Sequence, residues 1–441
     1  MQFNLTILQR YLFSLKFHKV VIFIIVICYV TNSVAQTNEI YFLRGQVVDK
    51  IRQQPLPYCN VSLKGKSIGT LSNETGFYEF KVKKEHLLDS LTISALGYQP
   101  ALFLVNEILQ EEWLKIELEP AAINLSEITI SAIPPLKIVQ RALENINNNY
   151  PTSSYISESF YREYITENQQ YKRLIEASLK ILEKGYTDNR ALKLKQIVSV
   201  EKIKKNHDYR TLKNYYWNGI EYLMNENIRG INPGGVINTY PLKDWKFTCD
   251  ETTQLNGEEV FIVNFKPAST NIARPEGILY ITTTDYAILK LDYSITTGLE
   301  NWHYSSLSDT TYLKYYGWET AFNYKRYNHK LYLNYLTHQR KFKVLHKQSQ
   351  AEFFDVEINN ELLVINIEKK IVLNFVDKHN EDYNYLLMRN EEFDKAYWRE
   401  FNLPPITEKL RKIYNQISRL GQEKRLSIIK FLKNRERMQP Q

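Results

Sequence analysis

Short runs of alternating hydrophobic and polar residues, separated by turn residues, fill the first part of the chain. Between residues 41 and 119 they recur at intervals of roughly ten residues, as in YFLRGQVV, YCNVSLKG, GFYEFKV, SLTISALG and LKIELEP. This spacing is typical of an antiparallel β-sandwich. Apolar residues occur on both sets of alternate positions in GFYEFKV, so we expect at least one face of that strand to be buried.

Glycines and an asparagine interrupt these runs between residues 64 and 82. We expect Gly65 and Gly69 to flank a tight connection, and Asn73 with Gly76 to form a short turn, because Asn and Gly tolerate positive φ at little cost. A phosphate-binding loop would need glycines that open a helix, whereas a strand pattern follows Gly76. The sequence therefore predicts turns here and no bound ligand.

A second and larger β region follows. Residues 155–375 are rich in Tyr, Phe, Ile and Thr with frequent alternation, which predicts an antiparallel β domain. The stretch after Gly277 predicts a long hairpin that turns at Thr284-Asp285. The stretch from Tyr171 to Leu182 fits a helix or a strand equally well, and both interpretations stay open.

Two helical segments flank the larger β region. Apolar residues at helical spacing predict an amphipathic helix over Lys137–Asn149, ended by Pro151. Residues 401–441 predict a basic amphipathic helical tail, since residues 404–441 carry ten Lys and Arg against three Glu. We favour a packed terminal helix with a solvated basic face; the alternative is peripheral contact of this tail with an anionic membrane surface.

The N-terminus has the pattern of a cleaved export signal. Basic residues precede the apolar run Val20–Val30, and Ser33-Val34-Ala35 places small residues where a signal peptidase cleaves. We expect residues 1–35 to be removed and the mature chain to begin at Gln36. An uncleaved anchor is the alternative, but the run is shorter than the roughly 20 residues of a spanning helix.

Charge and cysteine usage exclude some classes of protein. The net charge of +8 is concentrated in the signal segment and the tail, which leaves the body of the mature chain slightly acidic, so we expect no nucleic-acid partner. Of the three cysteines, only Cys59 and Cys249 lie in the mature chain. We expect two small buried hydrophobic residues, with a disulfide as the alternative that an exported location allows.

The first β region resembles the carboxypeptidase-regulatory-like domain, a transthyretin-like seven-stranded sandwich common in exported proteins of Bacteroidota. This resemblance is carried by Gly45, Val47, Asp49, Pro55, Leu56, Val61, Gly69, Thr70, Asn73, Gly76, Tyr78, Leu91, Gly97 and Tyr98. Ser72-Asn73 departs from the usual Thr-Asp of the family, a change that should leave the turn intact. The resemblance implies a non-catalytic module over residues 37–120.

These patterns together predict a mainly β chain. We expect residues 121–136 to form a linker, marked by Pro134-Pro135, and residues 137–400 to form a β-rich α+β domain of unknown function. A sequence similar to FYREY, at Phe160–Tyr164, occurs in uncharacterised regions that accompany this sandwich in envelope proteins. Some such regions resemble the half-open β-barrels of lipoprotein carriers, in which a long curved sheet lies over a helix.

A search for catalytic motifs finds none. Zinc carboxypeptidases use a His-x-x-Glu pair, yet none of the eight histidines is followed by Glu three residues later. The nearest cluster of ligand types is His379-Asn380-Glu381-Asp382, which we interpret as a polar loop. No GxSxG elbow or P-loop occurs, and Gly230–Gly235 is interpreted as a turn. We therefore predict no catalytic, cofactor or metal residues.

Aromatic residues are the main compositional excess, with 32 tyrosines. A stacking platform for sugars or a lining for an acyl chain is one interpretation of the aromatic-rich segment from Trp302 to Tyr335. We favour tyrosines that fill half-buried β faces. Adjacent carboxylates, such as Glu258-Glu259, Glu391-Glu392 and Glu111-Glu112, are interpreted as surface charge.

The leading hypothesis is an exported cell-envelope protein, in the periplasm, at the outer membrane or secreted. In it the sandwich supports a β-rich domain that binds an envelope protein, a lipid or a glycan. One alternative is a hydrolase whose catalytic residues are dispersed in the β-rich domain and leave no local motif. The other is a structural or adhesive scaffold.

Overall fold

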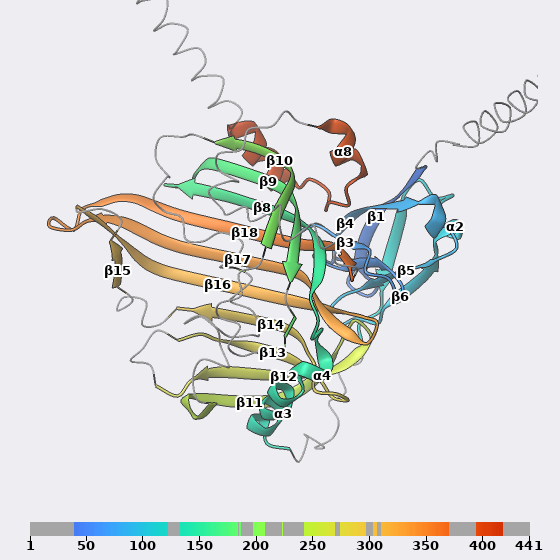
Figure 1. The fold of residues 1–441 in the computed structure, drawn as a ribbon, viewed down its shortest axis with the longest axis horizontal. Helices are drawn as coiled ribbons and strands as arrows, with labels where there is room; N and C mark the ends of the chain where they lie inside the picture. The colour runs from blue at the N-terminus through green and yellow to red at the C-terminus, as the bar shows by residue number, and fades with distance from the viewer. Residues whose placement is uncertain are drawn as a thin grey trace, which may run out of the picture.

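The computed structural model describes residues 39–121, 133–183, 185–186, 197–207, 223, 242–269, 274–296, 303–306, 310–369 and 394–417. Two β units make up this part of the chain (Figure 1). The predicted mainly β fold is confirmed, whereas the signal segment and the end of the basic tail lie outside the described residues.

The N-terminal unit is the predicted seven-stranded sandwich. One sheet has the order β4-β1-β7, and the other has the order β3-β2-β5-β6. Their bounds are β1 Ile40–Asp49, β2 Asn60–Leu63, β3 Gly69–Leu71, β4 Phe77–Lys83, β5 Ser90–Ser94, β6 Ala101–Leu104 and β7 Leu114–Leu118, with α2 at Val105–Ile108 and η1 at Lys84–His86.

Side-chain alternation builds the core of the sandwich. In β4, Tyr78, Phe80 and Val82 are buried at 1% exposure or less. The turn before this strand is the predicted one: Asn73 Oδ1 accepts hydrogen bonds from the backbone N of Thr75 and of Phe77, both at 3.0 Å. Gly76 has φ +77°, and a Cβ there would lie 2.5 Å from the carbonyl oxygen of Val47. Gly76 therefore allows the chain to turn at this position, as predicted.

The second unit is one large antiparallel sheet. Its order is β10-β9-β8-β18-β17-β16-β14-β13-β12-β11, with β15 paired to β16. The bounds are β8 Tyr155–Glu167, β9 Gln170–Glu183, β10 Ile197–His207, β11 Trp245–Leu255, β12 Glu258–Pro267, β13 Glu276–Thr282, β14 Ile288–Ile295, β15 His303–Ser306, β16 Thr311–Tyr327, β17 Lys330–His346 and β18 Glu352–Glu368.

Two sequence interpretations are settled in this sheet. The predicted hairpin is β13 and β14, which turn at Thr284-Asp285. The ambiguous stretch Tyr171–Leu182 is a strand within β9. It pairs on one side with β8 and on the other with β10, and this pairing selects the strand over the helix.

The predicted amphipathic helix lies on one face of this sheet, which we call the inner face. It is divided into α3, Pro135–Glu144, and α4, Ile146–Asn149. Ile138 and Val139 are fully buried in one cluster with apolar residues from the strands. Just after α4, Tyr150 donates a hydrogen bond from its hydroxyl to the Ile288 carbonyl at 2.6 Å, which fixes the helices over the β14 end.

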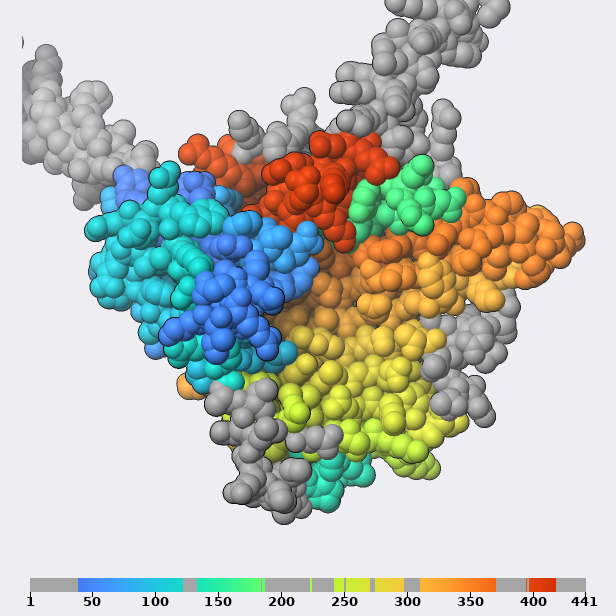
Figure 2. All heavy atoms as spheres, turned by 180° about the vertical axis from the view of Figure 1, so that it is seen from behind, coloured from blue at the N-terminus to red at the C-terminus, as the bar shows by residue number. Residues whose placement is uncertain are grey.

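The opposite, outer face carries the sandwich and the C-terminal segments. Figure 2 shows the molecule from behind, with the sandwich in blue and the C-terminal segments in red beside the orange and yellow strands. Ser67 Oγ donates a hydrogen bond to Asn366 Oδ1 at 2.6 Å, and the Gly97 backbone N donates to the Gln254 carbonyl at 2.8 Å. These hydrogen bonds join the two units.

A C-terminal segment also holds the two units together. After α8, Lys395–Glu400, the side chain of Asn402 pairs with both backbone groups of Lys81: Oδ1 accepts from N at 2.7 Å, and Nδ2 donates to O at 3.2 Å. Since β4 is an edge strand, this amide satisfies backbone groups that would otherwise face solvent.

The predicted tail helix is present over residues 408–417. Its apolar residues Leu410, Ile413 and Ile417 are buried against Tyr164 and Leu174 of the sheet, while the basic residues on the opposite side are exposed. For these residues the packed-helix interpretation is confirmed. No helix that the structure describes is long and apolar enough to cross a membrane.

Candidate functional site

The sandwich and the outer face of the large sheet enclose a cleft centred on two tyrosines. Tyr58 precedes β2 of the sandwich, and Tyr335 lies in β17. Their rings stack with centroids 6.1 Å apart and an interplanar angle of 22°. Both tyrosines line three adjoining hollows of about 570, 360 and 90 Å³, which together form the interdomain cleft.

Tyr58 is held in an unusual backbone conformation. Its φ is +55°, in the left-handed region that non-glycine residues enter at a cost of about 1–2 kcal/mol. It lies in the turn that precedes β2, and the residue remains 54% exposed. Strained residues of this kind cluster at binding sites, where the surrounding fold holds them in place.

The largest hollow is a polar groove along the outer face. Gln339 in β17 lies opposite Glu319 in β16 and Asn359 in β18, so the three side chains form one row across the sheet. The carboxylate and amide side chains that line this groove include Glu276, Asp292, Glu319, Gln339, Asn359 and Glu361. A groove of this volume is within the usual range for small-molecule sites, which is about 300–1,000 Å³.

Hydrogen bonds order part of this lining. Gln339 Nε2 donates to Asn359 Oδ1 at 2.8 Å and to Glu357 Oε1 at 2.9 Å. Burial raises the pKa of Asp292, and the adjacent ammonium of Lys290 opposes that rise. The Oδ1 atom of Asp292 has no hydrogen-bond partner among the described residues. The groove therefore combines fixed amides with carboxylates that retain acceptor capacity.

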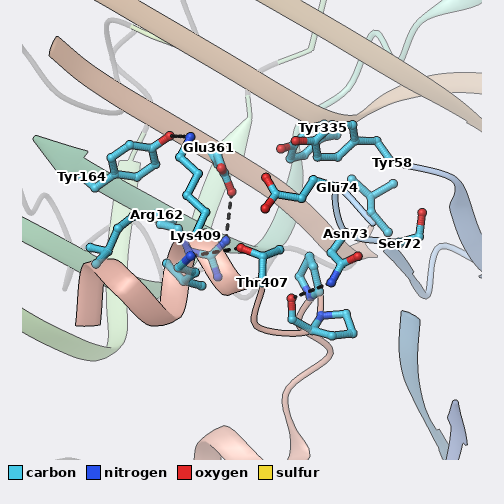
Figure 3. A pocket seen from close by; sticks show the side chains of 15 residues that line it. Tyr58, Ser72, Asn73, Glu74, Arg162, Tyr164, Tyr335, Glu361, Thr407 and Lys409 are labelled. Carbon is cyan, nitrogen blue, oxygen red and sulfur yellow. Dashed lines mark hydrogen bonds and ion pairs between the residues drawn. The ribbon is translucent and has the colours of Figure 1, made fainter. Parts of the chain in front are cut away.

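The smallest hollow lies where the sandwich, the sheet and the tail helix meet (Figure 3). Arg162 in β8 pairs with Glu176 at 2.9 Å and with Glu361 at 3.0 Å. Burial alone would lower the pKa of Arg162, but Glu176 and Glu361 raise it above its usual value. The arginine therefore stays charged and fixes Glu361 at the border between this hollow and the groove.

The tail helix supplies a second cation to the same junction. Thr407 Oγ1 accepts a hydrogen bond from the Leu410 backbone N at 3.0 Å, which caps the start of the helix. Lys409, in the first turn, donates from Nζ to the hydroxyl of Tyr164 at 2.9 Å (Figure 3). Both ends of this contact lie beside the tyrosine pair, so the tail helix helps to form the wall of the cleft.

The aromatic platform, which was the alternative interpretation of the segment from Trp302 to Tyr335, does not form one surface in the described residues, although Tyr335 lies in the cleft. Tyr312, Tyr315, Trp318 and Tyr324 are each less than 10% exposed and belong to the interior of the large unit. This burial is deeper than the half-buried faces that we favoured, while Trp302 lies outside the described residues. The exposed ring at the cleft is Tyr58, which the sequence analysis did not single out because its backbone conformation and its partner on β17 leave no local signal.

Other sequence interpretations have mixed outcomes. Glu258 pairs with Arg326 at 2.8 Å, so this carboxylate has a structural partner in addition to being near the surface. Cys59 and Cys249 are not joined by a disulfide; Cys59 is fully buried, as expected, and Cys249 is partly exposed. Within the described residues, no group of three or more His, Cys, Asp or Glu side chains is placed to hold a metal ion. The segments at 230–235 and 379–382 lie outside those residues.

Comparison with protein families identifies one module. Residues 43–130 match the family model of the CarboxypepD_reg-like domain, and this range contains most of the sandwich. The match confirms the resemblance for the N-terminal unit and covers less than half of the chain. A comparison with curated proteins gave no match.

Solved structures share general similarity with this chain at low identity. A domain assigned to an outer membrane lipoprotein-sorting protein of Vibrio parahaemolyticus is 13% identical, with 57% of this chain and 97% of that chain covered and a TM-score of 0.26. A LolA superfamily protein from Nitrosomonas europaea is 11% identical, with 56% and 97% covered and a TM-score of 0.20. MucB in a Pseudomonas aeruginosa complex with MucA is 7% identical, with 54% and 99% covered and a TM-score of 0.18. These values carry no information on ligand or activity.

Proposed function

We propose that this chain is an exported cell-envelope protein that binds a neutral glycan in the interdomain cleft. The sandwich acts as a non-catalytic module that positions Tyr58 over the outer face of the large sheet. The observation that carries the proposal is the exposed Tyr58 ring, stacked on Tyr335 beside a groove of amides and carboxylates.

Sugars present two kinds of surface to a protein. Their hydroxyl groups donate and accept hydrogen bonds, and the C–H face of the ring packs on aromatic side chains. The row of Glu319, Gln339 and Asn359 supplies acceptors and donors at fixed positions, while Tyr58 supplies an apolar ring. A lipid chain is a poorer match for this cleft because it would leave the carboxylate and amide groups of the groove without hydrogen-bond partners.

Binding of oligosaccharides to the mature chain tests this function. We would titrate neutral oligosaccharides of glucose, mannose and N-acetylglucosamine into wild type, Tyr58→Ala and Tyr316→Ala by calorimetry. Tyr316 is 44% exposed and lies away from the cleft, so its variant controls for loss of a surface tyrosine. Loss of the Tyr58 ring should weaken binding by about tenfold, whereas Tyr316→Ala should bind as wild type does.

Two results would overturn the proposal. One is an absence of heat with every neutral oligosaccharide in a chain that is folded by circular dichroism. The other is equal affinity in wild type and Tyr58→Ala, which would place the glycan outside the cleft.

Glycan hydrolysis is a second candidate, and Asp292 favours it. Its register opposite Ala321 places Asp292 diagonal to Glu319, and diagonal neighbours in a sheet are about 7–8 Å apart. Glycosidases use one carboxyl group of raised pKa with a second carboxylate about 5–9.5 Å away. Hydrolysis is supported if wild type releases reducing ends from an oligosaccharide and Asp292→Asn does not. If the chain binds the oligosaccharide without cleaving it, the function is binding alone.

A further inference from the structure

Another hollow lies next to the interdomain cleft, around Lys325 of β16. It has a volume of about 360 Å³, and the polar residues that matter here are Asn60, Ser62, Thr92, Ser94, Asn256 and Lys325. We call it the Lys325 pocket. Asn60, Ser94 and Asn256 also line the interdomain cleft, so the two sites are neighbours. The pocket shares neither Tyr58 nor the acidic groove with the glycan site.

Lys325 is an unusual residue at such a position. Its ammonium donates one hydrogen bond to the Lys66 carbonyl at 3.3 Å, across the boundary between the two units. Burial lowers the pKa of this amine to about 7 from its ordinary value of 10.5. A buried amine with so little compensation destabilises the fold, and such departures from good packing are expected mainly where a ligand or reaction uses the group.

The sandwich presents a polar face to this amine. Asn60 lies opposite Ser94, and Ser62 lies opposite Thr92, so all four side chains share the face of β2 and β5 that turns away from the sandwich core. Ser62 is 2% exposed, and its Oγ accepts a hydrogen bond from Asn60 Nδ2 at 3.3 Å, which leaves the hydroxyl proton of Ser62 to be donated. Thr92 Oγ1 is buried and has no hydrogen-bond partner in the described part of the chain.

The charges around the pocket favour an anion. Lys64 is exposed at its rim, and Arg326 is paired with Glu258 at 2.8 Å. Arg326 also pairs with Asp285 at 3.1 Å, but Asp285 does not line the pocket. Lys64, Lys325 and Arg326 therefore stand against one lining carboxylate, Glu258, and leave an excess of positive charge. An anion bound there would pair with the Lys325 amine and offset the cost of its burial.

We propose that the Lys325 pocket binds an oxyanion group, a phosphate or a carboxylate, through the Lys325 amine and the hydroxyls of Ser62 and Thr92. This site goes beyond the proposed glycan function and stands if that function fails. Its ligand is a free anion or an anionic group carried on a glycan that continues from the neighbouring cleft.

Titration with inorganic phosphate at constant ionic strength is the first test. We would compare wild type, Lys325→Met and Lys115→Met, where Lys115 is a 51% exposed lysine of β7 that supplies the same change of charge. Lys325→Met should weaken phosphate binding by about tenfold or more, as expected for loss of a charge-assisted hydrogen bond, and Lys115→Met should bind as wild type does. Equal affinity in wild type and Lys325→Met would overturn the proposal, as would no saturable binding of phosphate or acetate.

A second measurement uses wild type alone, in case Lys325→Met fails to fold. The amines of the mature chain would be labelled with acetic anhydride near pH 7, with and without phosphate, and located by mass spectrometry. We expect phosphate to protect Lys325 and to leave Lys115 unchanged; labelling of Lys325 that phosphate does not slow contradicts the site.

Binding of acidic and neutral oligosaccharides distinguishes a free anion from an anionic group carried on a glycan. A galacturonic acid hexasaccharide that binds more tightly than a neutral glucose hexasaccharide, and loses that advantage in Lys325→Met, identifies an anionic group on a glycan. Phosphate binding with no such advantage identifies a free anion. If neutral and acidic oligosaccharides both fail while phosphate binds at Lys325, the glycan function is wrong and the oxyanion site stands.

Discussion

The two faces of the large sheet differ although they are built from the same strands. On the inner face, Phe322, Leu336 and Leu362 form a row across three strands, and each is fully buried. The next row, on the outer face, consists of Ala321, Thr337 and Glu361, and it lines the cleft. A shift of one residue along each strand therefore separates the core from the candidate ligand site.

This contrast assigns different tasks to the two faces. Apolar burial with α3 and α4 on the inner face stabilises the sheet. The outer face leaves polar groups for a ligand, except where the tail helix and the sandwich cover it. Substitutions on the inner face should thus act on stability, and those in the open cleft should act on binding.

We expect the largest loss of stability from a substitution where the sandwich and the tail helix cover the outer face. Arg162→Met leaves Glu176 and Glu361 without their buried partner and should lower the free energy of unfolding by about 3–5 kcal/mol. Arg44→Met is the control, since the Arg44 side chain is 50% exposed and surface pairs contribute about 0–1 kcal/mol. Urea denaturation measures both; equal effects would mean that the Arg162 network contributes no more than a surface ion pair.

Adjacent residues on opposite faces test the contrast directly. Leu336→Ala removes fully buried inner-face atoms and should cost about 2–5 kcal/mol, whereas Thr337→Ala on the outer face should cost about 0.5 kcal/mol or less. Thermal unfolding of the two variants, followed by circular dichroism, gives the comparison. Similar losses for both would show that the cleft face is as tightly packed as the core.

The effect of Lys325 on stability should depend on pH. Because the pKa of Lys325 is about 7 in the folded chain and near 10.5 when unfolded, the unfolded chain binds more protons between these values, and wild type gains stability as pH rises. Lys325→Met should therefore have a higher free energy of unfolding than wild type near pH 7, with about 1.4 kcal/mol per unit of lowered pKa as the upper bound because the residue is only partly buried.

The Lys325→Met advantage should shrink as the pH rises from 7 and disappear only above about pH 11, where the amine is neutral in both states. Urea unfolding of both proteins in matched buffers without phosphate measures the difference across this range. A difference that stays constant with pH would show that Lys325 titrates normally.

The sequence predicted the sandwich well because its information is local. Turn residues such as Asn73 and Gly76 set the ends of short strands. The pairing of β1 with β4 and β7 is not local and was implied only by the family resemblance. The strand content of the large sheet followed from alternation in the same way. The pairing of β18 with β8 could not be predicted from alternation. Their ranges, Glu352–Glu368 and Tyr155–Glu167, are far apart in the sequence, and no local signal specifies their register.

The candidate site was beyond the sequence for a related reason. Tyr58 and Tyr335 come together only because the sandwich docks on the outer face, and docking depends on contacts such as Ser67 with Asn366. The lowered pKa of Lys325 likewise arises from burial between the two units. The local pattern of residues along the sequence predicts neither the docking of the sandwich nor the burial of Lys325.

Hydrogen–deuterium exchange of the mature chain, with and without the neutral oligosaccharides, tests the central claim most directly. The account predicts slower exchange in the segment around Tyr58 and in the outer-face strands around Tyr335 and Asn359, with no change in α3. Slower exchange confined to α3 and the strands beneath it would place the ligand on the inner face and contradict the account.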